Sequence, residues 1–232
     1  MKQLKAILLG CIILAALGCK KSDNDLETNS TIVNDNFKDG QGSWLIDFVD
    51  YPKGKEEEWE IGGGISKLPG PLDTTSMALR LSSINRSDDV FMFLKKKVTG
   101  LKPNQLYTVK LEIEFASNAP SNMLGVGGAP GENVYLKAGL TPIEPIKVLQ
   151  EDGYFRLNLD KDSESLSGKD LFYINHIANG TQEATYKLLN RSGEFKGRSN
   201  ENGEAWIVIG TDSGHEATTT LFYTKVKANV SY

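Results

Sequence analysis

The stretch Tyr107-Thr108-Val109-Lys110-Leu111-Glu112-Ile113-Glu114-Phe115 decides the fold of this 232-residue chain. Apolar and polar side chains alternate strictly along these nine positions. A period of two places all the apolar side chains on one face of an extended strand and the polar ones on the other. The pattern predicts a β-strand with one face in a hydrophobic core and the other face in solvent.

Similar signals recur along the chain. Further alternations occur in residues 77–81, 155–159 and 222–230. Continuous apolar runs occupy 90–94 and 205–209, which predicts strands covered on both faces. Gly, Pro, Asn and Asp separate these runs, and helical periodicity is scarce, with 183–190 ambiguous. We therefore predict an all-β fold, an antiparallel β-sandwich of jelly-roll architecture, as a single domain over residues 31–232.

The segment before the best strand carries a corner motif. Leu101, Pro103 and Tyr107 are spaced as Leu-x-Pro-x-x-x-Tyr, which is similar to the tyrosine corner of many extracellular sandwiches. In that corner the tyrosine hydroxyl bonds back to the backbone between two sheets. The alternative is that Tyr107 is only a core aromatic residue.

The first residues predict export from the cytoplasm and attachment to a membrane. Lys2 and Lys5 precede an apolar stretch over 6–17 that is too short to span a bilayer comfortably, as in a cleaved signal peptide. Residues 14–19 resemble a bacterial lipobox ending at Cys19, although Ala16 stands where leucine is preferred. The resemblance implies a signal peptide over 1–18 and a lipidated Cys19. An ordinary signal peptide cut after Gly18 and an uncleaved anchor are the alternatives.

Residues 20–30 are polar and acidic with a single apolar side chain, Leu26, so we expect 19–30 to be a lipidated cysteine followed by a disordered tether. The expected location is the cell envelope, anchored in a membrane through lipid, with the outer membrane favoured and its periplasmic or surface face left open. Several acyl chains make such an anchor durable.

Composition excludes some functions. Without residues 1–18 the chain has 30 acidic and 24 basic side chains, a net charge of −6, and shows no basic stripe, so we expect no nucleic-acid partner. The two cysteines, Cys11 and Cys19, both precede the predicted domain. The domain should therefore contain no disulfide, thiolate metal site or cysteine nucleophile.

Two sets of residues carry a family resemblance. Residues 34–44, with Phe37, Gly40, Gly42 and Trp44, resemble the opening strand of galactose-binding-like jelly rolls, a fold shared by many carbohydrate-binding modules. Three further stretches, 87–93, 125–132 and 210–214, resemble a group of secreted or lipid-anchored bacterial proteins of Bacteroidetes type without an assigned activity. The resemblance implies a fold and an envelope location, and it implies no reaction.

Exposed aromatic rings are the residues that would stack on sugars. Trp59 is flanked by Glu56, Glu57, Glu58 and Glu60, and we name Trp59 and Trp44 as candidate carbohydrate-binding residues. The alternative places both side chains in the core, where large aromatic residues dominate. Trp206 begins an apolar run and is expected in the core.

Acidic residues in turns are candidate calcium ligands, since calcium takes six to eight oxygens. The candidates are Asp88 with Asp89, and Asp212 with Glu216; Asp35 and Asp39 beside the C-terminal strand are a further possibility. Solvated turn acids are the alternative for each. Residues 160–164 lack the glycine and the final glutamate of an EF-hand, so that motif is excluded.

Catalytic motifs are sparse. The only histidines are His176 and His215, and no nucleophile elbow is present. Glu112 and Glu114 resemble part of the motif of laminarinase-like jelly rolls, but the third acid is missing and both lie on the predicted solvent face. The glycine-rich stretch 125–132 matches no nucleotide fingerprint, which leaves a tight loop or a backbone nest at a binding rim.

These observations predict a lipid-anchored, non-catalytic envelope module that binds a polysaccharide, with structural calcium as the cofactor considered. A polysaccharide-active hydrolase or lyase on a jelly roll is one alternative. An accessory lipoprotein that contacts another envelope protein is the other.

Overall fold

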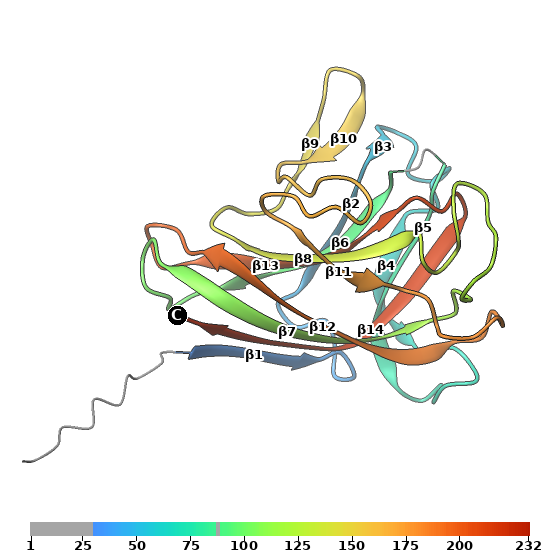
Figure 1. Ribbon diagram of the computed structural model, residues 1–232, viewed down its shortest axis with the longest axis horizontal. Coiled ribbons are helices and arrows are strands. Elements are labelled where there is room, and N and C mark those ends of the chain that lie inside the picture. The colour runs from blue at the N-terminus through green and yellow to red at the C-terminus, as the bar shows by residue number, and fades with distance from the viewer. Residues whose placement is uncertain (1–29, 87–88) are drawn as a thin grey trace, which may run out of the picture.

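The computed structural model describes residues 30–86 and 89–232, and within these ranges the chain forms strands and no helix (Figure 1). The strands are β1 (Ser30–Asn36), β2 (Leu45–Val49), β3 (Tyr51–Pro52), β4 (Gly62–Lys67), β5 (Met77–Ile84), β6 (Phe91–Val98), β7 (Leu106–Ser117), β8 (Val134–Thr141), β9 (Lys147–Leu149), β10 (Tyr154–Leu157), β11 (Phe172–His176), β12 (Lys187–Arg198), β13 (Ala205–Ser213) and β14 (Thr218–Ser231). The predicted signal peptide, Cys19 and nearly all of the tether lie outside the described residues.

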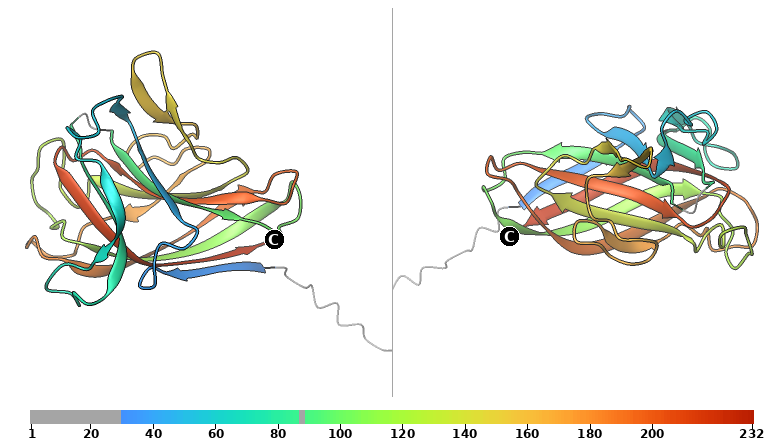
Figure 2. Two further views of the ribbon diagram at one scale, coloured as in Figure 1. Left: turned by 180° about the vertical axis from the view of Figure 1, so that it is seen from behind. Right: turned by 90° about the horizontal axis from the view of Figure 1, so that it is seen from above.

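Two antiparallel sheets pack face to face. One has the order β12-β7-β14-β5-β4, with β1 also paired to β14; the other has the order β11-β8-β13-β6-β2. A small third sheet, β3-β10-β9, extends above the second one (Figures 1 and 2). The predicted antiparallel β-sandwich of jelly-roll type is confirmed. No helix in the described ranges is long and apolar enough to cross a membrane.

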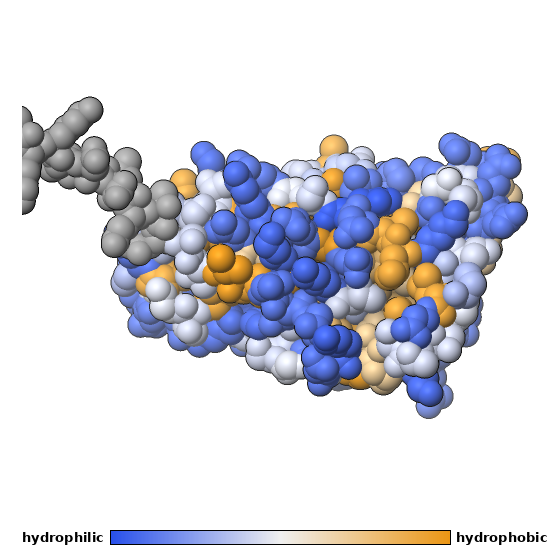
Figure 3. All heavy atoms as spheres, turned by 90° about the horizontal axis from the view of Figure 1, so that it is seen from below, coloured by the Kyte–Doolittle hydropathy of each residue, from blue (hydrophilic) through white to orange (hydrophobic). Residues whose placement is uncertain are grey.

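The strand that decided the prediction is β7, which lies between β12 and β14. Its inward side chains, Val109, Leu111, Ile113 and Phe115, are buried in the main core. Its outward side chains make contacts of another kind: Glu112 pairs with Lys227 of β14 at 3.1 Å, and Glu114 accepts a hydrogen bond from the hydroxyl of Thr224 at 2.6 Å. This outer face is largely hydrophilic, with separate apolar areas (Figure 3).

The two continuous apolar runs form β6 and β13, which pair with each other in the middle of the five-stranded sheet. Their inward residues join the main core. The outward residues Phe91, Phe93 and Val208 join a second cluster, where Leu159 and Leu171 from the long segment between β10 and β11 cover them. The sheet is therefore buried on both faces at this point, as the runs predicted.

The corner motif connects the two sheets. The hydroxyl oxygen of Tyr107 accepts a hydrogen bond from the backbone N–H of Lys102 at 2.7 Å, while its ring is 2% exposed. The residues between β6 and β7 therefore turn from one sheet to the other around this bond. The predicted tyrosine corner is confirmed, and the same ring also belongs to the core.

The long strand β14 separates two ends of the molecule. Its last residue, Ser231, pairs with Ser30, the first described residue, whereas its first residue, Thr218, pairs with Ile84 at the other end. A strand of 14 residues spans about 45 Å. The start of β1 and the C-terminus thus lie together at one end, and the loops between β7 and β8, β11 and β12, and β13 and β14 lie at the other (Figure 1).

Candidate functional site

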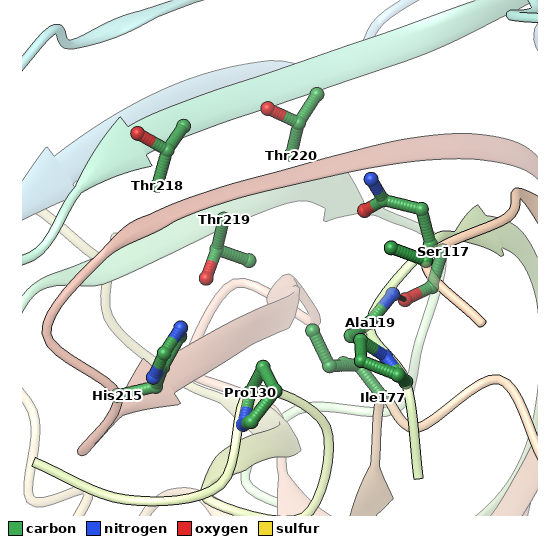
Figure 4. A pocket seen from close by; sticks show the side chains of 11 residues that line it. Ser117, Ala119, Pro130, Ile177, His215, Thr218, Thr219 and Thr220 are labelled. Carbon is green, nitrogen blue, oxygen red and sulfur yellow. Dashed lines mark hydrogen bonds between the residues drawn. The ribbon is translucent and has the colours of Figure 1, made fainter. Parts of the chain in front are cut away.

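A pocket of about 140 Å³ opens at the end of the sandwich where β14 begins; we call it the end pocket (Figure 4). Segments distant in sequence form its wall. The lining residues are Ser117, Asn118, Ala119, Pro120, Pro130, Ile177, Ala184, His215, Thr218, Thr219 and Thr220. The set mixes hydroxyl groups with small apolar side chains and contains no Asp, Glu, Lys or Arg.

The glycine-rich loop between β7 and β8 forms the rim of the end pocket. A Cβ on Gly125 would clash with the carbonyl oxygen of Gly128 and would lie 2.7 Å from Cε1 of His215. A Cβ on Gly131 would lie 2.6 Å from the Cβ of Ala178. Both contacts are closer than real Cβ atoms tolerate, so the loop reaches its position only because these residues lack side chains.

His215 lies in the wall with a fixed tautomer. Its Nδ1 is 3.0 Å from the carbonyl oxygen of Gly128 and 3.2 Å from that of Val126. A carbonyl oxygen can only accept a hydrogen bond, so these contacts require the proton on Nδ1, and the neutral tautomer that has it carries its lone pair on Nε2. The ring lies between Thr219 and Pro130 in Figure 4, with the Thr219 hydroxyl directed toward it.

The loop that carries His215 is held from both sides. Backbone bonds join Gly214 N–H to Asn133 O and Glu216 N–H to Val126 O, each at 2.9 Å. The buried amide of Asn85 donates to the carbonyl of Ser213 at 2.6 Å and to that of His215 at 3.1 Å. The position of the imidazole is therefore set before any ligand arrives.

The hydroxyl groups of the wall are partly committed. The Ser117 hydroxyl accepts the N–H of Ala119 at 3.1 Å, and the Thr220 hydroxyl bonds to that of Ser82 at 2.6 Å. Ala119, Pro130 and Ile177 present carbon atoms to the same pocket. The end pocket thus combines an apolar surface with the imidazole of His215 and contains no carboxylate, ammonium or guanidinium group.

A second concavity of about 310 Å³ lies outside the five-stranded sheet; we call it the charged cup. Its lining residues are Asp50, Asp89, Arg156, Leu157, Leu159, Asp160, Lys161 and Asp162. A chain of ion pairs runs beneath it: Lys137 to Asp212 at 3.0 Å, Lys161 to Asp212 at 2.9 Å, Lys161 to Asp50 at 3.4 Å and Arg156 to Asp50 at 3.6 Å. The segment between β10 and β11 is thereby fastened onto β8 and β13.

Burial shifts the pKa values of the groups in this network. Burial raises the pKa of Asp50 to about 6, and the lowering effect of Lys161 and Arg156 does not compensate. Burial also lowers the pKa of Lys137. For Lys161 burial acts in the same downward direction, but the carboxylates of Asp212 and Asp50 outweigh it and the pKa is raised.

The two tryptophans predicted to bind sugar are buried, and this corrects the expectation of an exposed platform. Trp44 is 1% exposed, packs against Phe37 and donates its indole N–H to Asp35 at 2.9 Å. Trp59 is 6% exposed because it lies in a turn between β3 and β4 and points into the core, while the glutamates beside it point to solvent. Trp206, expected in the core, is half-buried on the outer face, with Lys95 Nζ 5.4 Å from its ring.

The predicted calcium ligands do not converge. Asp212 is already bonded by two ammonium groups, which leaves its carboxylate unsuited to a cation. Asp89 lines the charged cup, Glu216 lies on the His215 loop, and Asp88 falls outside the described residues. Within the described ranges no three Asp, Glu, His or Cys side chains form a group that could hold a metal ion. The described candidates alone therefore do not form a calcium site.

Sequence reasoning missed most of the residues that form these two concavities. His215 was noticed only as one of two histidines, and Asp50, Arg156 and Lys161 carried no motif. Two signals pointed toward them: Asp89, named as a candidate calcium ligand, lines the charged cup, and the glycine-rich stretch lies beside the end pocket.

No protein family model matches this sequence, and no curated protein matches it either. Similar solved structures include TmCBM61 in complex with β-1,4-galactotriose, at 11% identity over 83% of this chain and 92% of that one, with a TM-score of 0.38. Another is the CBM22-1 xylan-binding domain of Paenibacillus barcinonensis Xyn10C, at 9% identity over 88% and 96%, with a TM-score of 0.43. A third is the K1 adhesin domain of Lys-gingipain from Porphyromonas gingivalis, at 9% identity over 85% and 97%, with a TM-score of 0.36. Carbohydrate-binding modules are thus among the similar structures, but such low identities give no residue-by-residue correspondence.

Proposed function

We propose that this chain is a non-catalytic glycan-binding module, anchored in the cell envelope through lipid on Cys19, and that its end pocket holds one neutral sugar ring. The observation that carries the proposal is the preorganised wall of the end pocket, which contains no Asp, Glu, Lys or Arg and combines apolar carbon atoms with the His215 imidazole, whose Nδ1 is held by the Gly128 carbonyl. The anchor is supported by residues 1–19 of the sequence, and calcium has no part in the proposal.

A sugar ring has the surface that this wall complements. Its C–H groups pack on apolar side chains, here Pro130, Ile177 and Ala119. Its hydroxyl groups donate and accept hydrogen bonds, here to Nε2 of His215 and with the hydroxyl of Thr219. A cavity well below the 300 Å³ of typical drug-sized sites suits one ring at the end or side of a polymer better than a long stretch of chain.

The test is binding of the full-length chain, in detergent, to a panel of neutral and acidic glycans, followed by titration of the best neutral ligand into variants. His215→Asn keeps a donor for the Gly128 carbonyl but removes the acceptor at Nε2. Loss of one ligand hydrogen bond should weaken binding by about 5- to 10-fold.

His176→Asn is the matched control, because His176 lies on β11 and does not line the end pocket. It should leave the affinity unchanged. Equal affinity of wild type and His215→Asn would contradict the assignment of the pocket. Failure of every neutral glycan to bind would contradict glycan binding itself, and release of new reducing ends from the panel would contradict the non-catalytic part.

A further inference from the structure

The charged cup contains an acceptor and a donor that are buried without a hydrogen bond. Among the residues that the structure describes, neither Oδ2 of Asp50 nor Nη1 of Arg156 has a hydrogen-bond partner. Their nearest opposite charges are farther away than a normal hydrogen bond: Lys161 Nζ is 3.4 Å from Asp50 Oδ2, and Arg156 Nη1 is 3.6 Å from Asp50 Oδ1. Buried polar atoms are rarely left in this condition.

Asp50 is also placed at a cost to stability. Its residue is 4% exposed, and its backbone has a φ of 66°, in the left-handed region that few side chains adopt. Burial disfavours the charge of its carboxylate. Conformational strain and an unfavourable buried charge at one residue beside a cavity are typical of functional sites.

The buried position of Asp50 is not explained by a need to hold the segment between β10 and β11, because other residues hold that segment. Asp212 bonds to Lys161 at 2.9 Å and accepts the backbone N–H of Glu164 at 3.1 Å. Lys137 donates to the carbonyl oxygens of Lys161 at 2.7 Å and Asp162 at 3.2 Å. The segment is thus held from β8 and β13, and Asp50 remains over the cup.

We infer that the charged cup is a second binding site and that it takes a neutral hydroxyl-bearing ligand, a sugar ring, whose hydroxyl donates to Asp50 and accepts from Arg156. A hydroxyl group can satisfy both atoms at once. An ammonium group would satisfy Asp50, leave Nη1 of Arg156 without a hydrogen bond and meet the positive charges of Arg156 and Lys161. A carboxylate would satisfy Arg156 and meet the negative charges of Asp50 and Asp89.

This inference extends the proposed glycan binding to another place on the molecule, and it is tested with residues that do not line the end pocket. The experiment follows the NMR signals of the isotopically labelled full-length chain in detergent. The probes are methyl β-glucoside and methyl β-galactoside, with glucosamine and glucuronate as charged comparators. At least one neutral glycoside should shift the Arg156 side-chain signals, and the charged sugars should do so at least fivefold more weakly.

Asp50→Asn should weaken this response by fivefold or more. Arg156→Met removes the reporting side chain, so its response is read at the backbone amide of Lys161, which also lines the cup, and this response should be weakened to the same extent. The methionine keeps an apolar stem on the ring of Tyr154, which now lies 4.5 Å from the guanidinium. Asp47→Asn is the matched control, because Asp47 pairs with Lys147 and does not line the cup. His215→Asn should leave the response intact, which separates this site from the end pocket.

Several outcomes would overturn the inference. These are no response at Arg156 with either neutral glycoside, a stronger response with a charged sugar, or an equal loss of response in Asp47→Asn. Should Asp50→Asn not fold, Arg156→Met decides alone. A response at Arg156 with none at His215 would support the cup while removing the end pocket from the proposed function.

Discussion

At the scale of single residues, Asp50 makes the stability of this fold depend on pH. Burial raises its pKa from 3.8 to about 6, so the folded chain holds this proton more tightly than the unfolded chain does. Stability from this group is therefore greatest below pH 3.8 and is lost as the pH rises through the window up to 6. Above pH 6 the ionised carboxylate costs the folded state ~3 kcal/mol.

Asp50→Asn should consequently stabilise the protein at neutral pH. We expect an increase in the free energy of unfolding of about 1–3 kcal/mol at pH 7.5, and a smaller slope of stability against pH between 4 and 6.5. Asparagine also tolerates the left-handed backbone at this position. Urea unfolding at a series of pH values measures both effects.

Asp47→Asn is the comparison for this measurement, because Asp47 is a partly exposed acid paired with Lys147 at 3.1 Å. It should change stability by less than about 0.5 kcal/mol. A lower stability of Asp50→Asn than of the wild type at pH 7.5 would show that the ion pairs of Asp50 outweigh its burial.

Tyr107 contributes a single identifiable bond. Tyr107→Phe removes the acceptor for the Lys102 N–H and keeps the ring in the core, so the free energy of unfolding should fall by ~1 kcal/mol. Tyr186→Phe is the control, because no hydrogen bond of the Tyr186 hydroxyl is found among the described residues, and its ring contacts Phe222. Equal stability of both variants would show that the hydrogen bond between Tyr107 and Lys102 does not stabilise the fold.

At the scale of elements, the rim loop depends on glycines that have no room for a side chain. Gly125→Ala places a methyl group against the Gly128 carbonyl and the His215 ring, so the loop must move. We expect a loss of about 1–3 kcal/mol in stability, together with weaker binding of a neutral glycan in the end pocket. Unfolding in urea and glycan titration measure the two losses.

Gly214→Ala is the matched change in the facing loop. The nearest heavy atom to its new Cβ is the carbonyl oxygen of Asn133 at 3.5 Å, an ordinary contact. This variant should keep both stability and binding within about twofold in affinity. If Gly125→Ala behaves in the same way, the close approach of the loop to His215 is not needed for the site.

The elements differ in how far their own sequence determines them. Strand β7 was predicted from its period of two, and β6 and β13 from continuous apolar runs, because both patterns report burial directly. The start of β12 was ambiguous, because Leu188 points to solvent and Arg191 reaches the backbone of His176 and Ala178 instead of forming part of an apolar face. Trp59 was misjudged because alternation with charged neighbours has meaning only in a strand, and Trp59 occupies a turn.

The two concavities were beyond sequence reasoning for a topological reason. The wall of the end pocket combines the end of β7, the start of β14 and three loops, and no local pattern marks residues that only the pairing of distant strands brings together. The pKa of Asp50 likewise depends on burial by the segment between β10 and β11, more than a hundred residues further on.

At the scale of the whole molecule, stability comes from the core without covalent cross-links. The only cysteines of the sequence are Cys11 and Cys19, outside the described residues. A reducing agent should therefore leave the thermal unfolding midpoint of the sandwich unchanged within about 1 °C, because no disulfide constrains its unfolded state. A calorimetric scan with and without dithiothreitol checks this, and a clear drop with dithiothreitol would reveal a cross-link.

The pairing of Ser30 with Ser231 at one end of β14, and the pocket at the other, has a geometric consequence. If the chain is held at its first strand, as in the proposed anchoring, the loops around the end pocket stand off from the surface by about the length of β14, some 45 Å. In the proposed glycan-binding role, this distance would let the end pocket meet the outermost units of a bulky polymer away from the anchoring layer.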